Sequence, residues 1–301
     1  MNRYDNQRGQ TMVLSLLFMV ALMAVATGVL DVGSWYRTHR HTQATADAAA
    51  LAAAQELPEE TATATSMAVD YGDRNDGGVA AQDVVLTSAV MTNDTVKVTA
   101  RKNAPVFLSR LFGFKNLTAR ASATARVGVL GSARYAAPIG VDLLHPMLQC
   151  EPLPCFNQTT QLDLKKTGPG AFRLINIDGS RGGTSPQILG DWLRNGYDGY
   201  MPINWYFSDP GAKFDSSHIQ GALDDRIGSD LLFPVYSDIR GGGSNFQYEV
   251  IGWVGFHLTG FDARGNSGKL DGWFTHVIWE GIYSEHATGD DFGARSVSLV
   301  E

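Results

Sequence analysis

Cysteine is scarce in this chain of 301 residues, which contains only Cys150 and Cys155. A structural zinc site needs four ligands, and apart from His145 no histidine or further cysteine stands near this pair at a ligand spacing. The sequence therefore predicts no zinc site. The pair suits a small disulfide loop held by Pro152 and Pro154, or else two free thiols. We favour the disulfide, which requires an oxidising compartment.

Catalytic motifs are also lacking. The seven histidines include no His-Glu-x-x-His run, and the chain has no Gly-x-Ser-x-Gly run. His257 and His276 fall on two predicted strands that could pair, and with Glu280 or Glu285 they could bind a metal ion. The favoured interpretation is two half-buried strand histidines, so we expect no catalytic residue, no metal and no cofactor.

Charged residues make up only 18% of the chain, and the charge is unevenly spread. Residues 1–130 carry 12 Lys and Arg against 11 Asp and Glu, whereas residues 131–301 carry 12 against 20. Binding a phosphate backbone takes clustered cations. The acidic second half therefore argues against a nucleic-acid partner.

One long apolar run stands out against this background. Met12–Leu30 holds no charged residue, and its 19 residues would span about 28 Å as a helix, close to the hydrocarbon thickness of a bilayer. We predict a cytoplasmic N-terminus at 1–10 and a transmembrane helix at 11–33, with Arg3 and Arg8 favouring this orientation only weakly. The alternatives are a signal peptide cleaved after Ala26 and a buried core helix.

The predicted helix continues beyond the membrane. Trp35 to Leu57 is rich in alanine and ends before Pro58, so anchor and extension together would run about 47 residues, or roughly 70 Å. Trp35 and Tyr36 stand where interfacial aromatics are common. One face of the extension is expected to pack either on a partner helix or on the protein's own domain, and it consists of Ala44, Ala48, Leu51 and Gln55.

The first 57 residues resemble the TadE/TadG-like proteins of the Tad (Flp) pilus-assembly system. The resemblance rests on Arg8-Gly9-Gln10, the apolar run, Asp31-Val32-Gly33 and the block at 46–54, ADAAALAAA. It implies a bacterial single-pass protein of the cytoplasmic membrane, with an exported C-terminal domain that takes part in building or tipping a pilus. It also implies contacts with other Tad components, and a capacity for self-association, through an assembly helix whose marked residues are Asp31, Gly33, Tyr36, Gln43, Asp47, Ala48 and Leu51.

Two departures from that family limit what carries over. Prepilin-type processing uses a glutamate five residues after the cleaved glycine, and here Leu14 stands five residues after Gly9. The Asp-x-Ser-x-Ser metal motif of many TadG proteins is missing as well. We therefore expect a retained anchor without metal-dependent adhesion.

Beyond the long helix the fold class is predicted as α+β. Residues 34–130 read as a helical stalk with a small pilin-like α+β module: a helix at 59–71, strands at 83–90 and 95–101, a helix at 105–112 and a strand at 117–129. Residues 131–301 read as a β-rich exported domain resembling an antiparallel sandwich. Its predicted strands lie at 161–165, 171–177, 246–258 and 270–279, and its short helices at 188–194 and 219–227.

Five tryptophans of the β-rich region fit the core of that domain better than a sugar-stacking surface: Trp192, Trp205, Trp253, Trp273 and Trp279. The first hypothesis for function is a membrane-anchored, non-enzymatic structural component of a Tad pilus system. The second is an anchored cell-surface binding module unconnected with pili. An anchored hydrolase is a distant third.

Overall fold

The computed structural model describes residues 8–75, 77–106, 113, 117–150, 155–164, 172–210, 213–242, 245–263, 268–284 and 291–300. The chain forms two compact units, Met1–Arg126 with Ser298–Glu301 and Val127–Val297, here called unit 1 and unit 2. It passes from unit 1 to unit 2 within one strand and returns within another. The boundary between these compact units lies between Arg126 and Val127. The predicted division into domains, with its boundary between residues 130 and 131, stays a prediction.

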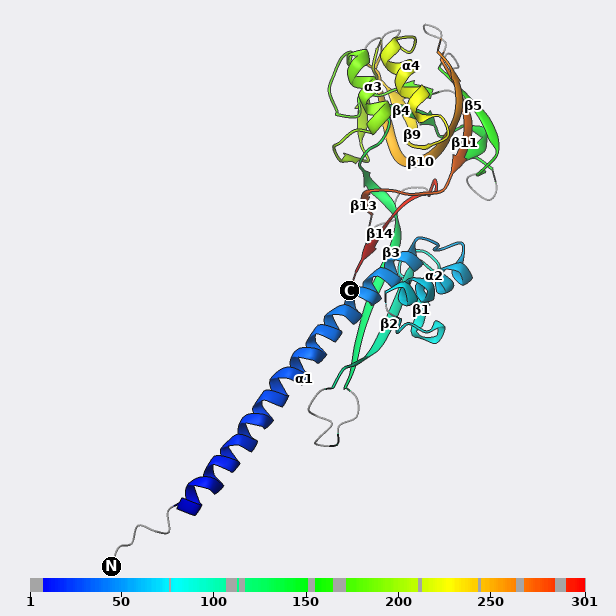
Figure 1. Ribbon diagram of the computed structural model, residues 1–301. Helices are drawn as coiled ribbons and strands as arrows, with labels where there is room; N and C mark the ends of the chain where they lie inside the picture. Colours follow the sequence, from blue (N-terminus) through cyan, green and yellow to red (C-terminus); the bar gives the residue numbers. More distant parts are fainter. Residues whose placement is uncertain are drawn as a thin grey trace, which may run out of the picture. The chain divides into compact units, whose positions relative to one another are not determined.

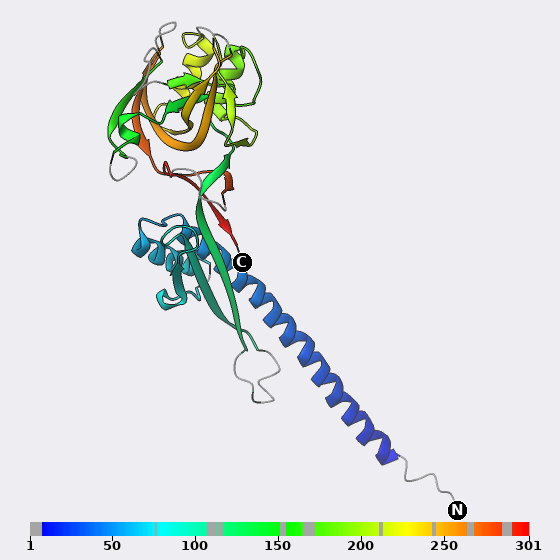
Figure 2. The ribbon, with the colours of Figure 1, turned by 180° about the vertical axis from the view of Figure 1, so that it is seen from behind.

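In the part of unit 1 that the structure describes, two α-helices pack with a small antiparallel sheet. Its elements are α1 (Arg8–Ala54), α2 (Thr61–Arg74), the 3-10 turn η1 (Ala81–Asp83), β1 (Val84–Thr87), β2 (Thr95–Ala104) and the first part of β3 (Leu117–Ala133). The strands pair in the order β1-β2-β3, and β2 meets β3 in register from Thr95↔Arg126 to Ala104↔Leu117. Figures 1 and 2 show α2, β1 and β2 gathered along the C-terminal half of α1.

The long helix is confirmed as one continuous element of 47 residues. Gly28 and Gly33 do not interrupt the helix, because each lowers its stability by only about 1 kcal/mol relative to alanine. The predicted helix at 105–112 lies for the most part outside the described residues.

Unit 2 is built on a curled sheet of seven strands. The path runs β5 (Thr159–Asp163), β11 (Lys269–Thr275), β10 (Gln247–Asp262), β9 (Asp230–Arg240), β4 (Ile139–Asp142) and β6 (Phe172–Leu174), with β8 (Trp205–Phe207) paired to β10. All these pairings are antiparallel except β4 with β9. Register shifts in β10 near Val250 and Leu258 act as bulges, which bend a strand and increase its twist.

Helices cover one face of this sheet and short strands lie over the other. Figure 1 shows α3 (Pro186–Asn195) and α4 (Ser217–Arg226) side by side over the curled sheet. Their buried side chains join those of β9, β10 and β11 in one core, which includes Leu189, Ile219, Phe233, Phe256 and Phe274. A second core lies on the opposite face, around Trp253, Tyr236 and Leu130.

The remaining strands of unit 2 are short. They are β7 (Met201–Pro202), β12 (Val277–Ile278), β13 (Gly281–Tyr283) and the first part of β14 (Ala294–Leu299), preceded in the chain by the 3-10 turn η3 (Pro146–Leu148). β13 and β7 pair with the end of β3, and β12 lies parallel to β14. The α+β class and the β-rich C-terminal region are thus confirmed.

β9 is a central strand that the sequence pattern did not predict. Residues 231–236 are all buried, so the strand has none of the alternation that marks a strand with one wet face. Pro234 also disfavours a central strand, because it cannot donate a ladder hydrogen bond. Here it pairs with Trp253 on β10.

The loop between β1 and β2 depends on one buried carboxylate. Asp94 is fully buried and accepts hydrogen bonds from the backbone N–H groups of Ala89, Val90 and Met91 at 2.7–2.8 Å and from the Thr95 hydroxyl at 2.7 Å. Burial acts to raise the pKa of Asp94, but these hydrogen bonds outweigh it and hold the pKa below the ordinary value of 3.8. The ionised carboxylate therefore organises the loop.

Asp94→Ala is expected to lower the free energy of opening of the β1–β2 region by about 2 kcal/mol, because buried N–H groups lose their acceptor. Amide hydrogen exchange in the full chain measures this. The stabilisation from Asp94 should be complete above the unfolded pKa near 4 and fade as the pH falls through the lower folded value. Asp73→Ala, at an exposed position, is the control and should change stability by no more than ~0.5 kcal/mol; an equal loss in both variants would contradict the assignment.

Candidate functional site

The N-terminal half of α1 is a bare apolar helix. Large apolar side chains between Met12 and Val32 are 54–78% exposed, and only 6% of the most apolar window is buried. Among the described residues, α1 alone is long and apolar enough to cross a membrane. A core helix of a soluble domain would be mostly buried, so this exposure fits a single-pass membrane anchor.

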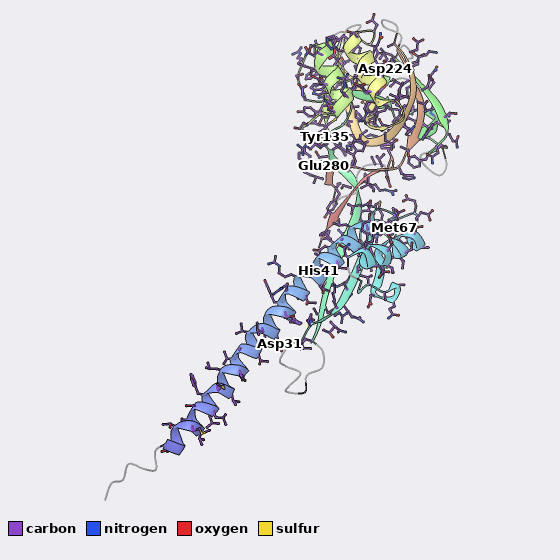
Figure 3. All side chains as sticks on the ribbon, viewed as in Figure 1. Asp31, His41, Met67, Tyr135, Asp224 and Glu280 are labelled. Carbon is purple, nitrogen blue, oxygen red and sulfur yellow. A yellow bond between two sulfur atoms is a disulfide. The ribbon has the colours of Figure 1, made fainter. Side chains whose placement is uncertain are left out.

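Two residues near the end of this apolar segment are exceptions. Thr27 is 7% exposed and Asp31 is 2% exposed, while their neighbours Val29, Leu30 and Val32 are more than half exposed. Thr27 also donates a hydrogen bond to the Met23 carbonyl at 2.7 Å. Figure 3 marks Asp31 and, further along α1, His41. One face of the helix is thus buried already at the last turns of the apolar segment.

The covered face continues through the alanine-rich half. Its buried positions follow steps of three and four residues, which place them on one side of a helix: Thr42, Thr45, Ala46, Ala49, Ala50 and Ala53. Opposite them β3 buries alanine at every second position, at Ala119, Ala121, Ala123 and Ala125, and β2 buries Val96, Val98 and Ala100. Small side chains on both sides allow a close approach of helix and sheet.

Hydrogen bonds fix this docking along the helix. The Ser34 hydroxyl donates to the Pro105 carbonyl at 2.9 Å, and the Trp35 indole donates to the Thr118 carbonyl at 3.4 Å. Further along, the Gln43 amide donates to the Ser122 carbonyl at 3.3 Å. The helix is therefore tied to the backbone of its own sheet at several levels.

The seven marked residues of the assembly helix fall in different environments. Asp31 is buried, and the Gln43 amide donates to the Asp47 carboxylate at 2.7 Å. Tyr36 is 56% exposed, and a Cβ added at Gly33 would meet nothing within 4 Å. Ala48 and Leu51 are half-buried.

The face of Ala44, Ala48, Leu51 and Gln55 lies away from the docked side. Ala44 and Gln55 are exposed, whereas Ala49 and Ala53 on the other side are fully buried. Unit 1 therefore packs mainly against a different face of α1 than the one that the sequence analysis expected to make a packing contact. A signal for the docked face was present in the sequence as small polar residues at helical spacing, Thr27, Ser34, Thr38, Thr42 and Thr45.

In unit 2, Cys150 and Cys155 are joined by a disulfide with Cα atoms 5.9 Å apart. His257 bonds the Asp230 carboxylate through Nδ1 at 2.7 Å and stacks on Trp273 at 4.4 Å between ring centroids. His276 packs against Phe156. No group of three or more His, Cys, Asp or Glu within the described ranges could hold a metal ion, and Glu285 falls outside those ranges.

The tryptophans of unit 2 are divided between core and surface. Trp253 is buried, and Trp192 and Trp279 pack partly against the cores. Trp205 carries the Arg240 guanidinium 4.1 Å above its ring, and Trp273 is only partly buried beneath His257. The interpretation as core residues thus fits Trp192, Trp253 and Trp279 better than it fits Trp205 and Trp273.

A cluster of charged side chains joins segments of unit 2 that lie far apart in the sequence. The sequence analysis did not predict it. Arg134 donates to Glu280 at 2.7 Å and to Asp198, and it lies over the Tyr135 ring. The hydrogen bonds to Glu280 and then Asp198 raise the pKa of Arg134, which stays a cation. Beside it lies an open pocket of about 320 Å³, lined by Asp191, Trp192, Asn195, Gly196, Tyr197, Asp198 and Gly199. Aromatic faces and carboxylates of this kind suit a sugar or a cationic group.

Comparison with known proteins bears on the helix alone. Residues 9–56 match the model of the Tad family, described as Flp pilus-assembly TadE/G-like. The match spans the apolar segment and the docked alanine-rich segment of α1, which confirms the resemblance carried by those residues. No curated protein and no solved structure matches the chain.

Ala49→Leu should destabilise unit 1 by about 1–3 kcal/mol, because the fully buried Ala49 leaves no room for a larger side chain. Ala44→Leu, one to two turns away on the exposed face, is the matched control and should stay within ~0.5 kcal/mol of the parent chain. Hydrogen exchange of the β2 and β3 amides measures both. A similar loss in the two variants would mean that both faces are packed.

Proposed function

We propose that this chain is a membrane-anchored, non-enzymatic structural component of a bacterial Tad (Flp) pilus-assembly system. The observation that carries the proposal is the coincidence, on one helix, of the family match at 9–56 with a lipid-suited half and a docked half. A family defined by a pilus-assembly role matches the part of the chain that would meet both the bilayer and its protein neighbours. Residues beyond 56 contribute a folded body rather than a recognisable catalytic motif.

The proposed topology has the N-terminus in the cytoplasm and residues from about 34 onward on the far side of the cytoplasmic membrane. Arg3 and Arg8 before the apolar run favour this orientation only weakly, because Arg37 and Arg40 follow the run. The bridge between Cys150 and Cys155 supports it, since disulfides persist in oxidising compartments. A single-pass helix is the anchor in this arrangement.

The proposed assembly contact is the exposed face of α1 formed by Ala44, Ala48, Leu51 and Gln55. Unit 1 leaves Ala44 and Gln55 of this face exposed and Ala48 and Leu51 half-buried, while it buries the opposite face. A small, flat helix face lets a second helix approach closely. Other Tad components, or a second copy of this chain, are the partners it would take.

A second candidate function is an anchored cell-surface binding module unconnected with pili. The pocket lined by Trp192 and Asp198 in unit 2 favours it, because aromatic and carboxylate groups together recognise sugars. Deletion of the gene separates the two: loss of pili supports the first function, and normal pili with lost adhesion support the second. Immunogold labelling then locates the protein relative to the filament.

Ala44→Arg with Ala48→Arg is expected to abolish pili while leaving the protein folded and at its normal level in the membrane. Two large cations on this face, where Ala44 is exposed and Ala48 half-buried, block the close approach of a helix partner. Electron microscopy of complemented deletion cells measures piliation, and membrane immunoblotting measures the protein. Ala44→Ser with Ala48→Ser is the control that keeps the face small; normal pili in the arginine variant would reject this face as the assembly contact.

The proposed topology also predicts the redox state of the cysteines. Protein isolated from cells with an alkylating agent present and without reductant should give a mass two hydrogens below that of the dithiol, with no alkylation of Cys150 or Cys155. The same chain expressed without residues 1–33 in a reducing cytosol should be alkylated at both. Alkylation of both cysteines in the membrane-bound chain would argue against an exported unit 2.

A further inference from the structure

The part of unit 1 closest to the apolar segment carries cations and no acids. Residues 32–46 and the described residues of 101–120 together contain five Lys and Arg and not one Asp or Glu, in a chain whose net charge is −7. Asp31 is the sole acid between residues 6 and 46, and it is 2% exposed, so it is hidden from the surface. Charge is therefore segregated along this unit, with its positive end toward the anchor.

Hydrogen bonds show at which level of α1 the sheet ends. The bonds from Trp35 to Thr118 and from Gln43 to Ser122 pair eight helical residues, about 12 Å, with four strand residues, about 13 Å. β3 therefore runs along the helix axis. Its end, Leu117, pairs with Ala104 beside the Ser34–Pro105 hydrogen bond.

That level lies at the edge of the predicted hydrocarbon. Ser34 stands four residues beyond Leu30, the last residue of the apolar run, which corresponds to about 6 Å. The headgroup layer on each side of a bilayer is about 5–7 Å thick. The strand ends of β2 and β3 thus reach the headgroup layer whenever α1 spans the membrane.

Exposed arginines surround this level. Arg37 and Arg40 on α1 and Arg120 on β3 are exposed, and none of them forms an ion pair with any residue of the ranges that the structure describes. Helical side chains lean toward the N-terminus of their helix, which here is the membrane side. Trp35 and Tyr36, 36% and 56% exposed, add interfacial aromatics at the same height.

We propose that this end of unit 1 is a binding surface for the anionic headgroups of the bilayer that holds α1. The surface comprises helix residues 34–40 together with the strand residues 102–106 and 117–120. The inference rests on the proposed membrane anchoring and adds a lipid preference to it. The bilayer is favoured over a soluble acidic partner because the anchor keeps lipid headgroups permanently within reach of these cations.

The test compares the full chain in nanodiscs of neutral phosphatidylcholine with nanodiscs that also contain anionic phosphatidylglycerol. Amides of residues 102–106 and 117–120 should exchange more slowly in the anionic discs, and high salt should remove the difference. The variant Arg37→Gln, Arg40→Gln, Arg120→Gln should lose it. In that variant the enrichment of anionic lipid retained by the protein should fall about fivefold for each cation removed.

A charge-matched control removes three cations elsewhere, by Arg74→Gln, Lys97→Gln and Arg181→Gln, and should behave as the parent chain. Equal exchange in both kinds of disc, or equal loss in both variants, would overturn the proposal. Slower exchange in neutral discs on addition of soluble polyphosphate, to the same degree as with anionic lipid, would assign the surface to a soluble anion instead. Alkaline extraction reports insertion separately: a chain that is extracted refutes the anchor and this inference together, whereas an inserted chain without lipid dependence refutes this inference alone.

Discussion

The docking of one alanine face on the β2–β3 pair is the interaction on which the rest of unit 1 depends. α1 meets two incompatible surroundings along its 47 residues, and no break separates them. Where the helix is apolar all round, it needs lipid to cover it. Where it is alanine-rich, it buries Ala46, Ala49, Ala50 and Ala53 against small residues of the sheet, and the close approach this permits brings side-chain donors such as Ser34 and Gln43 within reach of strand carbonyls.

Rigidity follows from this docking. A free helical stalk would bend and rotate relative to its sheet, but α1 is tied by hydrogen bonds at levels from Ser34 to Thr45, which donates to the Asn75 carbonyl at 3.0 Å. The orientation of the exposed Ala44 face is therefore fixed relative to the sheet. The same hydrogen bonds hold the ends of β2 and β3 beside Ser34, four residues beyond the apolar run.

The long helix could be predicted well from the sequence, whereas the other elements could be predicted only in part. An uncharged run of 19 residues and a block of alanines admit only one local structure, and helix ends near Pro58 follow from proline chemistry. The docked face was harder to predict. Its threonines and alanines recur at the same helical spacing as the alanines of the exposed face, so no local pattern distinguishes the two faces. β9 was missed because burial on both sides removes alternation, and the contacts of Arg134 with Asp198 and Glu280 join positions 64 and 146 residues apart, which no local pattern records.

The way the chain leaves and re-enters unit 1 makes unit 2 an insertion. Residues 127–297 depart from β3 and come back in β14, and the Val300 N–H donates to the Thr124 carbonyl at 2.9 Å, so both junctions lie on neighbouring backbone. A unit inserted in this manner is connected covalently to its host at two points of the chain rather than one. Pulling forces on it are shared between two strands, and its sequence can diverge or be exchanged while the anchored host keeps its own fold.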